Sequence, residues 1–274
     1  ILNLKKEKSV KMLAWLNQMT FSNGQIPWLN DSAPGIAPTT KRLNDYASRL
    51  NLKPGILINS SILSDSGYRR YNGSNYECIA DVGPIGPSYQ PGHAHADIFN
   101  FVLNIHNDSL IIDTGISTYE ACNQRVWERS TQAHNTVTIN DKNSSQVWSA
   151  FRVGKRAHVT LLKEDRNDIL GRHNGFNKAF HFRQWNFNEN RIQITDTLEG
   201  KYIKGKAHLL LNPDVEPEIK DNEVICHDTR ISFDNHDEIN ILKTRIPKGY
   251  NQYINIHKIE ISFNRFLKTT ISIN

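Results

Sequence analysis

The spacing of apolar side chains changes once along the chain, close to Pro54 and Gly55. Before this point, apolar residues recur every three or four positions over residues 1–21, with lysines between them, and again over residues 38–50. This spacing predicts two amphipathic helices, and the proline and glycine end the second of them. Two helices are too little for a domain, so residues 1–54 are interpreted as the end of a larger helical domain.

After this break the apolar period falls to two, and short alternating runs are separated by turns rich in Asn, Asp and Gly. The pattern predicts many short strands, of which residues 98–105 and 110–113 form a hairpin. Further strands are expected at residues 74–81, 135–139, 157–163, 180–187, 191–197, 207–211, 223–227, 231–233, 239–243, 258–263 and 267–274. The fold class predicted for residues 55–274 is therefore mainly β, an antiparallel β-sandwich preceded by the short helical segment.

The composition of the 274 residues narrows the function classes. The formal net charge of +5 is compatible with an anionic partner, but the basic residues are scattered and no nucleic-acid motif is present, so no nucleic-acid partner is expected. No run of about 18 apolar residues occurs, so no membrane span is expected. The widely spaced Cys78, Cys122 and Cys226 form no metal motif or disulfide framework. No start methionine and no apolar stretch of a signal peptide are visible in these residues, and we expect the chain to be part of a longer protein.

The residues with the clearest chemical potential lie between positions 84 and 146. Two histidines, His93 and His95, stand two positions apart, and Asp113 and His134 follow downstream. On a strand the two histidines would point to the same face, because side chains alternate with a period of two. Imidazole and carboxylate together suit Zn²⁺. Three of these four residues therefore form a plausible metal set, and the fourth is a plausible base.

Two other metal-site patterns draw on the same residues. A cupin site needs a glycine, a His-x-His pair and then a glutamate shortly after, and no glutamate follows the histidines closely here. His95, Asp97 and His134 spell the two-histidine, one-carboxylate triad of non-haem Fe(II) oxygenases. That triad leaves Asp113 unused and brings its second histidine early for the usual double-stranded helix. The oxygenase nevertheless stays open as an alternative at this point.

Several spaced strings, in this order, resemble the heparinase II/III-like family. The strongest are Gly92–Asp97, Ile112–Tyr119 and Arg125–Val137. Residues 143–148 and 151–156 are similar to the continuation seen in members linked to bacterial surface-polysaccharide clusters. The loop of residues 24–32 also resembles a segment near the end of the family's N-terminal (α/α) toroid.

The resemblance implies an (α/α) toroid followed by a C-terminal β-sandwich, here residues 1–54 as the remnant of the toroid and residues 55–274 as the sandwich. It implies a polysaccharide lyase that acts on an anionic, uronate-containing glycan such as heparin, heparan sulfate or alginate. Carried over residue by residue, it implies one zinc ion, with a structural role, bound by His95, Asp113 and His134.

The resemblance also implies where the substrate lies. His93 matches a histidine that faces the substrate, and with Tyr119 it is predicted to be catalytic. The predicted substrate-binding residues are Asn30, Asp31, Arg125 and Arg129. For the two arginines, hydrogen bonds to nearby carboxylates such as Glu120 or Glu128 are the ordinary structural alternative.

In the family, the catalytic tyrosine comes from the toroid, most of which lies outside these residues. We therefore expect little or no lyase activity from the 274 residues alone. Two alternatives stay open: a non-catalytic glycan-binding or structural β-sandwich with a structural zinc, and the Fe(II) oxygenase. The family also suggests a periplasmic or secreted location.

Overall fold

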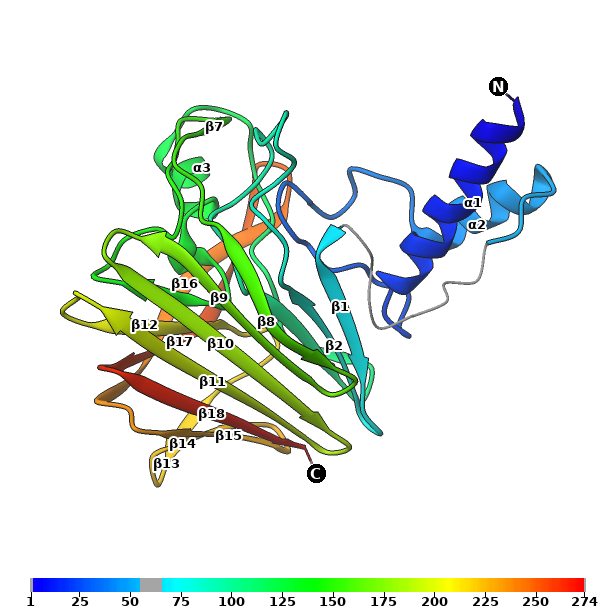
Figure 1. Cartoon of the computed structure of the whole chain (residues 1–274). Coiled ribbons are helices and arrows are strands. Elements are labelled where there is room, and N and C mark those ends of the chain that lie inside the picture. Colours follow the sequence, from blue (N-terminus) through cyan, green and yellow to red (C-terminus); the bar gives the residue numbers. More distant parts are fainter. Residues whose placement is uncertain (1, 55–65, 274) are drawn as a thin grey trace.

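A computed structural model of the protein describes residues 2–54 and 66–273, in which two helices lie to one side of a large β-sandwich (Figure 1). Helix α1 spans Leu2–Gln18 and helix α2 spans Thr40–Arg49. The side chain of Thr39 caps α2 by accepting a hydrogen bond from the main chain of Arg42. Both predicted helices are present, each a few residues shorter than predicted. The predicted domain boundary borders residues 55–65, which lie outside the described residues.

Antiparallel sheets make up the rest of the described chain. The largest sheet has eight strands in the order β13 (Glu218–Lys220), β14 (Glu223–Cys226), β15 (Thr229–Asp234), β18 (Phe266–Ile273), β11 (Arg191–Gly200), β10 (Ala179–Asn188), β9 (Asp168–Phe176) and β8 (Val159–Asp165). Two four-stranded sheets have the orders β1 (Tyr68–Asn72), β2 (Tyr76–Asp81), β3 (Phe101–Ile105), β4 (Asp108–Ile111), and β16 (Glu238–Gly249), β17 (Gln252–Phe263), β12 (Gly205–Leu210), β5 (Val137–Ile139). A bridge between Ile111 and Leu211 joins these two sheets. A small hairpin pairs β6 (Val147–Trp148) with β7 (Arg152–Val153).

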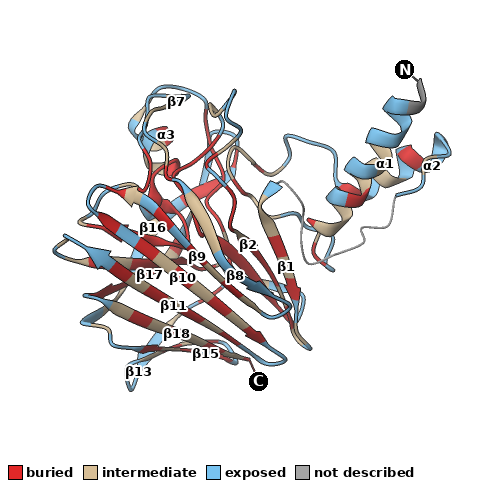
Figure 2. Ribbon diagram, viewed as in Figure 1, coloured by how far each residue is buried: buried red, intermediate tan, exposed pale blue. Residues whose placement is uncertain are grey.

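Alternating side chains hold the sandwich together. Along β10 and β11, buried residues alternate with more exposed ones (Figure 2). The inward side chains, among them Trp185 and Ile192, join one hydrophobic cluster with Phe101 of β3 and Phe263 of β17. Each such side chain contributes about 1.5–3 kcal/mol when fully buried. The mainly β, antiparallel sandwich predicted from the sequence is confirmed.

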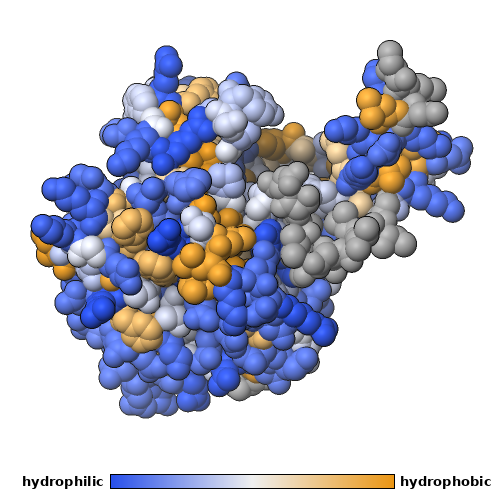
Figure 3. Space-filling model, viewed as in Figure 1, coloured by the Kyte–Doolittle hydropathy of each residue, from blue (hydrophilic) through white to orange (hydrophobic). Residues whose placement is uncertain are grey.

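The surface seen in Figure 3 is mostly hydrophilic, with separate apolar areas. This is what a sandwich with its apolar residues turned inward produces. None of the helices in the described residues is both long and apolar enough to span a membrane.

Some elements differ from the sequence prediction. Strand β9 was not predicted, since Gly171 and the polar residues around it hide its alternation. A Cβ at this glycine would lie only 2.7 Å from the ring of Phe99, so the position accepts glycine for a packing reason. The hairpin β16–β17 is much longer than the two strands predicted there. Residues 91–97, which carry His93 and His95, form turns rather than a strand.

A chain of buried polar groups crosses the core of the eight-stranded sheet. The main-chain N–H of Gly175 donates to Nδ1 of His173 (3.2 Å), whose Nε2 contacts Nδ1 of His181 (3.0 Å). Nε2 of His181 contacts Oδ1 of Asp196 (2.7 Å), and Arg183 donates two hydrogen bonds to the same carboxylate. Since the carboxylate only accepts, each histidine is neutral with its proton on Nε2. Burial lowers the pKa of both histidines.

This arrangement predicts that the fold loses stability in mild acid. A proton added to either histidine would place one N–H against another, and the unfolded chain takes up these protons below about pH 6.5. The free energy of unfolding should fall as pH drops through this range, by up to about 1.4 kcal/mol per pH unit for each histidine. Urea unfolding between pH 7.5 and 5.5 measures this slope. His173→Gln, which keeps a donor, should reduce it.

The matched control for this prediction is His158→Gln, because His158 is exposed. This variant should keep the wild-type slope. An unchanged slope in His173→Gln would contradict the prediction.

Asp196 contributes separately to the free energy of unfolding, at much lower pH. Burial raises its pKa, but Arg183 and His181 outweigh burial and hold the pKa at about 2. Its contribution is present above the unfolded value near pH 4 and is lost only as pH falls through about 2.

Candidate functional site

The candidate site lies where loops at one end of the sandwich meet the loop between α1 and α2. Asn135 connects three of the segments that build it. Its side chain donates to the carbonyls of Phe101 and Ile112, both 2.8 Å, and accepts from the main chain of Leu210 (2.7 Å). Its own main-chain N–H donates to Asn100 (2.9 Å). The residues next to these, including His134 and Asp113, are thereby fixed relative to one another.

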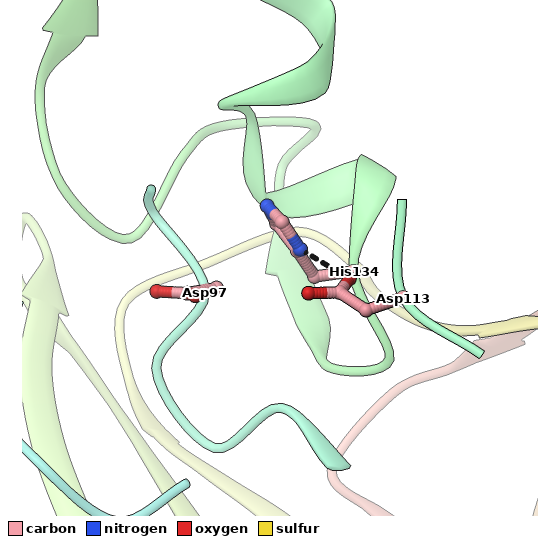
Figure 4. A group of neighbouring side chains, drawn as sticks. All are labelled: Asp97, Asp113 and His134. Atoms are coloured by element: carbon pink, nitrogen blue, oxygen red, sulfur yellow. Dashed lines mark hydrogen bonds and ion pairs between the residues drawn. The ribbon is translucent and has the colours of Figure 1, made fainter. Parts of the chain in front are cut away.

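The inner part of the site consists of Asp97, Asp113 and His134 (Figure 4). All three are buried, and one potential ligand atom from each lies within 4.8 Å of the others. Nδ1 of His134 contacts Oδ1 of Asp113 at 2.6 Å. A carboxylate in this position holds the imidazole with its proton on Nδ1 and leaves Nε2 with a lone pair.

His95 lies beside this group, with its ring centroid 5.2 Å from that of His134. Nε2 of His95 contacts Oδ1 of Asp31 at 2.9 Å. Burial lowers the pKa of His95 to about 4, although the hydrogen bond to Asp31 opposes this. The ring is therefore neutral near pH 7, and its proton sits on Nε2 because the carboxylate must accept. Nδ1 of His95 then carries a lone pair.

Four buried atoms of this cluster have no hydrogen-bond partner among the described residues. They are Nδ1 of His95, Nε2 of His134, Oδ2 of Asp97 and Oδ2 of Asp113. Burial is the main cause that raises the pKa of Asp97 to about 6, with the charge of Asp113 adding to it and that of His134 opposing it. Buried lone pairs without donors are costly. A cation held between Asp97, Asp113 and His134 would satisfy three of these atoms, whereas His95 does not lie within 4.8 Å of all three residues. The residues thus fit a metal ion of the kind that imidazole and carboxylate bind.

Asp31 links the helical segment to the site. Its side chain is only 5% exposed and contacts Nδ1 of His93 (2.7 Å), His95, and both terminal nitrogens of Arg125. Burial raises its pKa, but the hydrogen bonds and charges of His95 and Arg125 outweigh burial and hold the pKa at about 2. Asn30 accepts from the main chain of His95 (3.1 Å). Asn30 and Asp31, which were predicted to bind substrate, therefore also orient the histidines. Their contact with substrate stays a prediction.

Arg125 and Arg129 lie behind the site rather than on its surface. Both are fully buried. Arg125, from helix α3 (Asn123–Glu128), binds Asp31, and Arg129 donates to the carbonyl of Ala94 (3.1 Å). Neither guanidinium is hydrogen-bonded to Glu120 or Glu128, so the local pairing considered from the sequence is not found in the described residues. Their enclosure also argues against the predicted direct contact with substrate, because their donors are directed at protein acceptors.

The two predicted catalytic residues lie at the mouth of the site. The side chain of His93 is 58% exposed, and its ring centroid lies 5.8 Å from that of Tyr119. Because Asp31 accepts from Nδ1, the exposed Nε2 of His93 carries the lone pair. Although His93 and His95 do not lie on a strand, Asp31 brings their rings to a single carboxylate.

Two features of the site were not predicted from the sequence. Asp97 lies with Asp113 and His134, although the predicted zinc set omitted it. The signal was present, since Asp97 follows His95 within the same short string. Phe151 lies against the ring of His93, with 5.5 Å between centroids. No local sequence pattern predicts this contact, because the two residues lie far apart in the sequence.

Fold and site together define an antiparallel β-sandwich with a buried histidine–carboxylate cluster at one end. Residues 58–273 match the family model described as "Heparinase II/III-like, C-terminal". The chain therefore belongs to the heparinase II/III-like family. The resemblance predicted from the sequence is confirmed, while the link to bacterial surface-polysaccharide clusters stays a prediction. A search of curated proteins finds no match.

Solved structures show the same fold. One is a heparan sulfate lyase, HepC from Pedobacter heparinus, with a TM-score of 0.76 and 18% identity over 93% of this chain and 45% of that one. Another is a heparinase III described as the BT4657 gene product, with a TM-score of 0.75 and 15% identity over 93% of this chain and 44% of that one. The chain thus spans less than half the length of these structures.

Proposed function

We propose that this chain is the sandwich part of a polysaccharide lyase that cleaves an anionic, uronate-containing glycan by β-elimination. The observation that carries the proposal is the exposed imidazole of His93, whose Nδ1 is held by the buried carboxylate of Asp31. Membership of the heparinase II/III-like family supports it, and so do the solved heparan sulfate lyase and heparinase III of the same fold.

The chemistry of elimination assigns a task to each exposed group. The reaction removes the proton at C5 of the uronate and expels the oxygen at C4. A base needs a lone pair within reach of the substrate, and Nε2 of His93 offers one. Burial and the charge of Asp31 raise the pKa of Tyr119, which keeps its hydroxyl protonated and able to donate to the leaving oxygen.

The C5 proton becomes acidic enough only when the neighbouring carboxylate is neutralised. Arg125 and Arg129 are enclosed and do not offer this contact. We propose that the neutralising group and the remaining catalytic tyrosine come from the part of the relatives' length that this chain does not span. The chain then holds one side of the cleft and is expected to bind glycan without efficient turnover.

We further propose that one zinc ion binds in the buried cluster. His95, Asp113 and His134 would hold it, as the resemblance implies, and we propose Asp97 as a fourth ligand, because it lies with Asp113 and His134. Structural zinc sites are four-coordinate and closed. When bound, the ion supplies positive charge that compensates the two buried carboxylates. The protein residues hold the loops of the site in register, and no role in activating water is assigned to the ion.

The proposal is tested by measuring binding and turnover of the chain on uronate polymers. Retention on immobilised heparan sulfate or alginate is expected. Little increase should appear in the ultraviolet absorbance of the unsaturated uronate that elimination creates. Efficient turnover by these 274 residues would overturn the division of the site between two parts. Failure to bind any uronate polymer would overturn the substrate class.

A non-catalytic glycan-binding sandwich is the second candidate, because the metal-type cluster is entirely buried. It predicts the same binding. The two are separated by His93→Ala in a chain extended to include the catalytic tyrosine. A lyase loses its turnover in this variant, whereas a binding module has no turnover to lose. The oxygenase alternative is less well supported, because it leaves the neighbouring carboxylate of Asp113 without a role.

A further inference from the structure

A group of aromatic rings surrounds the exposed face of His93. Phe151 lies 5.5 Å from His93 and 5.3 Å from Tyr119, measured between ring centroids. Tyr250 extends the group, with its centroid 6.1 Å from that of Tyr119. The three rings are exposed to a similar degree, 43% for Phe151, 37% for Tyr119 and 44% for Tyr250. Large aromatic side chains are seldom left this open in contact with one another, and exposed apolar clusters mark binding surfaces.

Two buried arginines fix the position of Phe151. Its ring lies over the guanidinium of Arg125, 5.5 Å from ring centroid to Cζ, and the ring of Tyr119 lies over the same guanidinium at 5.4 Å. Arg125 also donates to the carbonyl of Ala150 (3.0 Å). Arg129 donates to the carbonyls of Ser149 (3.3 Å) and Ala150 (3.1 Å). Two buried arginines therefore hold the turn that presents Phe151, and a surface ordered in advance loses less entropy on binding.

The charge around this surface suits an anionic ligand. Arg152 and Lys155 follow Phe151 and are exposed, while one exposed carboxylate, Glu120, follows Tyr119. From Lys142 to Lys163 the chain contains no aspartate or glutamate. Positive charge beside exposed rings favours a ligand that is both anionic and able to cover an aromatic face.

We propose that Phe151, with Tyr119 and Tyr250, forms a stacking subsite for a pyranose ring of an acidic glycan, next to His93. This inference rests on the proposed function and names the contact that holds a sugar there. One face of a pyranose ring carries C–H groups that complement the negative face of an aromatic ring. The hydroxyls at the edge of the sugar are left for polar groups such as Nε2 of His93.

The test is the affinity of the full 274-residue chain for heparan sulfate and alginate hexasaccharides, measured by calorimetry. Phe151→Ala should weaken binding by about tenfold, because the variant lacks the aromatic face on which the sugar stacks. The matched control is Phe180→Ala. Phe180 is similarly exposed, at 39%, and lies over Arg172 in the same manner, but on strand β10. This control should bind like the wild type.

A neutral hexasaccharide of the cellulose type separates this inference from the proposed function. If only the neutral sugar binds, and Phe151→Ala abolishes that binding, the stacking subsite stands and the uronate substrate class fails. If acidic hexasaccharides bind equally well to the wild type and Phe151→Ala, the subsite is overturned while the substrate class stands. If no sugar binds, both are overturned. If the variant changes only the oligomeric state of the chain and not its affinity, the subsite alone is overturned.

Discussion

In the Asp113→Ala protein, zinc content is expected to fall from about one ion per chain to none. Asp113 contacts Nδ1 of His134 and has a second buried oxygen without a partner among the described residues. Its removal takes away both a ligand and the group that orients the imidazole. Mass spectrometry of purified protein measures the metal. Asp108→Ala is the control, since Asp108 is an exposed residue at the start of the strand that precedes Asp113.

Three single substitutions identify the ligand set. His95→Gln, Asp97→Asn and Asp113→Asn each weaken binding if all four residues hold the ion, as we propose. If Asp97→Asn has no effect, the ligands are those implied by the sequence resemblance. Iron that is lost in Asp97→Asn and retained in Asp113→Ala would contradict the zinc site and favour the oxygenase. Circular dichroism of each variant shows whether a lost metal reflects a lost fold.

Replacing Arg183 by methionine should destabilise the protein by about 3–5 kcal/mol, because Asp196 is left as a buried charge without its partner. Arg183 is 2% exposed and forms two hydrogen bonds with this carboxylate. It also donates to the carbonyls of Phe99 and Asn135, each at 2.8 Å. These carbonyls lie two residues from Asp97 and one from His134. The same substitution should therefore weaken metal binding, although Arg183 is not itself a proposed ligand.

Urea unfolding at pH 7.5 measures the loss of stability. Arg172→Met serves as control, because Arg172 is exposed on the neighbouring strand β9, and a change within about 0.5 kcal/mol is expected there. The double variant Arg183→Met, Asp196→Asn removes both charges and should recover part of the loss. A loss below about 1 kcal/mol in Arg183→Met, or no recovery in the double variant, would count against a buried ion pair that stabilises the site.

Much of the fold could be predicted from local patterns. The period of 3.6 before Pro54 and the period of two after it correspond to the helices and to most of the strands. Prediction failed where a tertiary contact overrides the local pattern. Gly171 and His173 make β9 look irregular, yet the glycine accommodates the ring of Phe99 and the histidine belongs to a buried chain of polar groups.

The candidate site was predictable in its residue types but not in its pairings. His95, Asp113 and His134 were singled out because imidazole and carboxylate recur in one short region. The structure groups Asp113 and His134 with Asp97, and it places the ring of His95 beside that of His134. That Asp31 would contact His93, His95 and Arg125 was not predictable. These contacts join the loop between the helices to segments more than 60 residues away. The spacing of residues along the chain does not predict such long-range contacts.

The sequence by itself determined that this chain forms a β-sandwich with histidine–carboxylate chemistry in one stretch, because periodicity and residue type are local properties. Only the tertiary structure decided which of those groups are buried and which face solvent. It enclosed Arg125 and Arg129, left His93 open and surrounded it with Tyr119 and Phe151. Burial and contact depend on how distant segments pack together. That packing gives the site a buried cluster of ionisable groups and an exposed histidine at the surface.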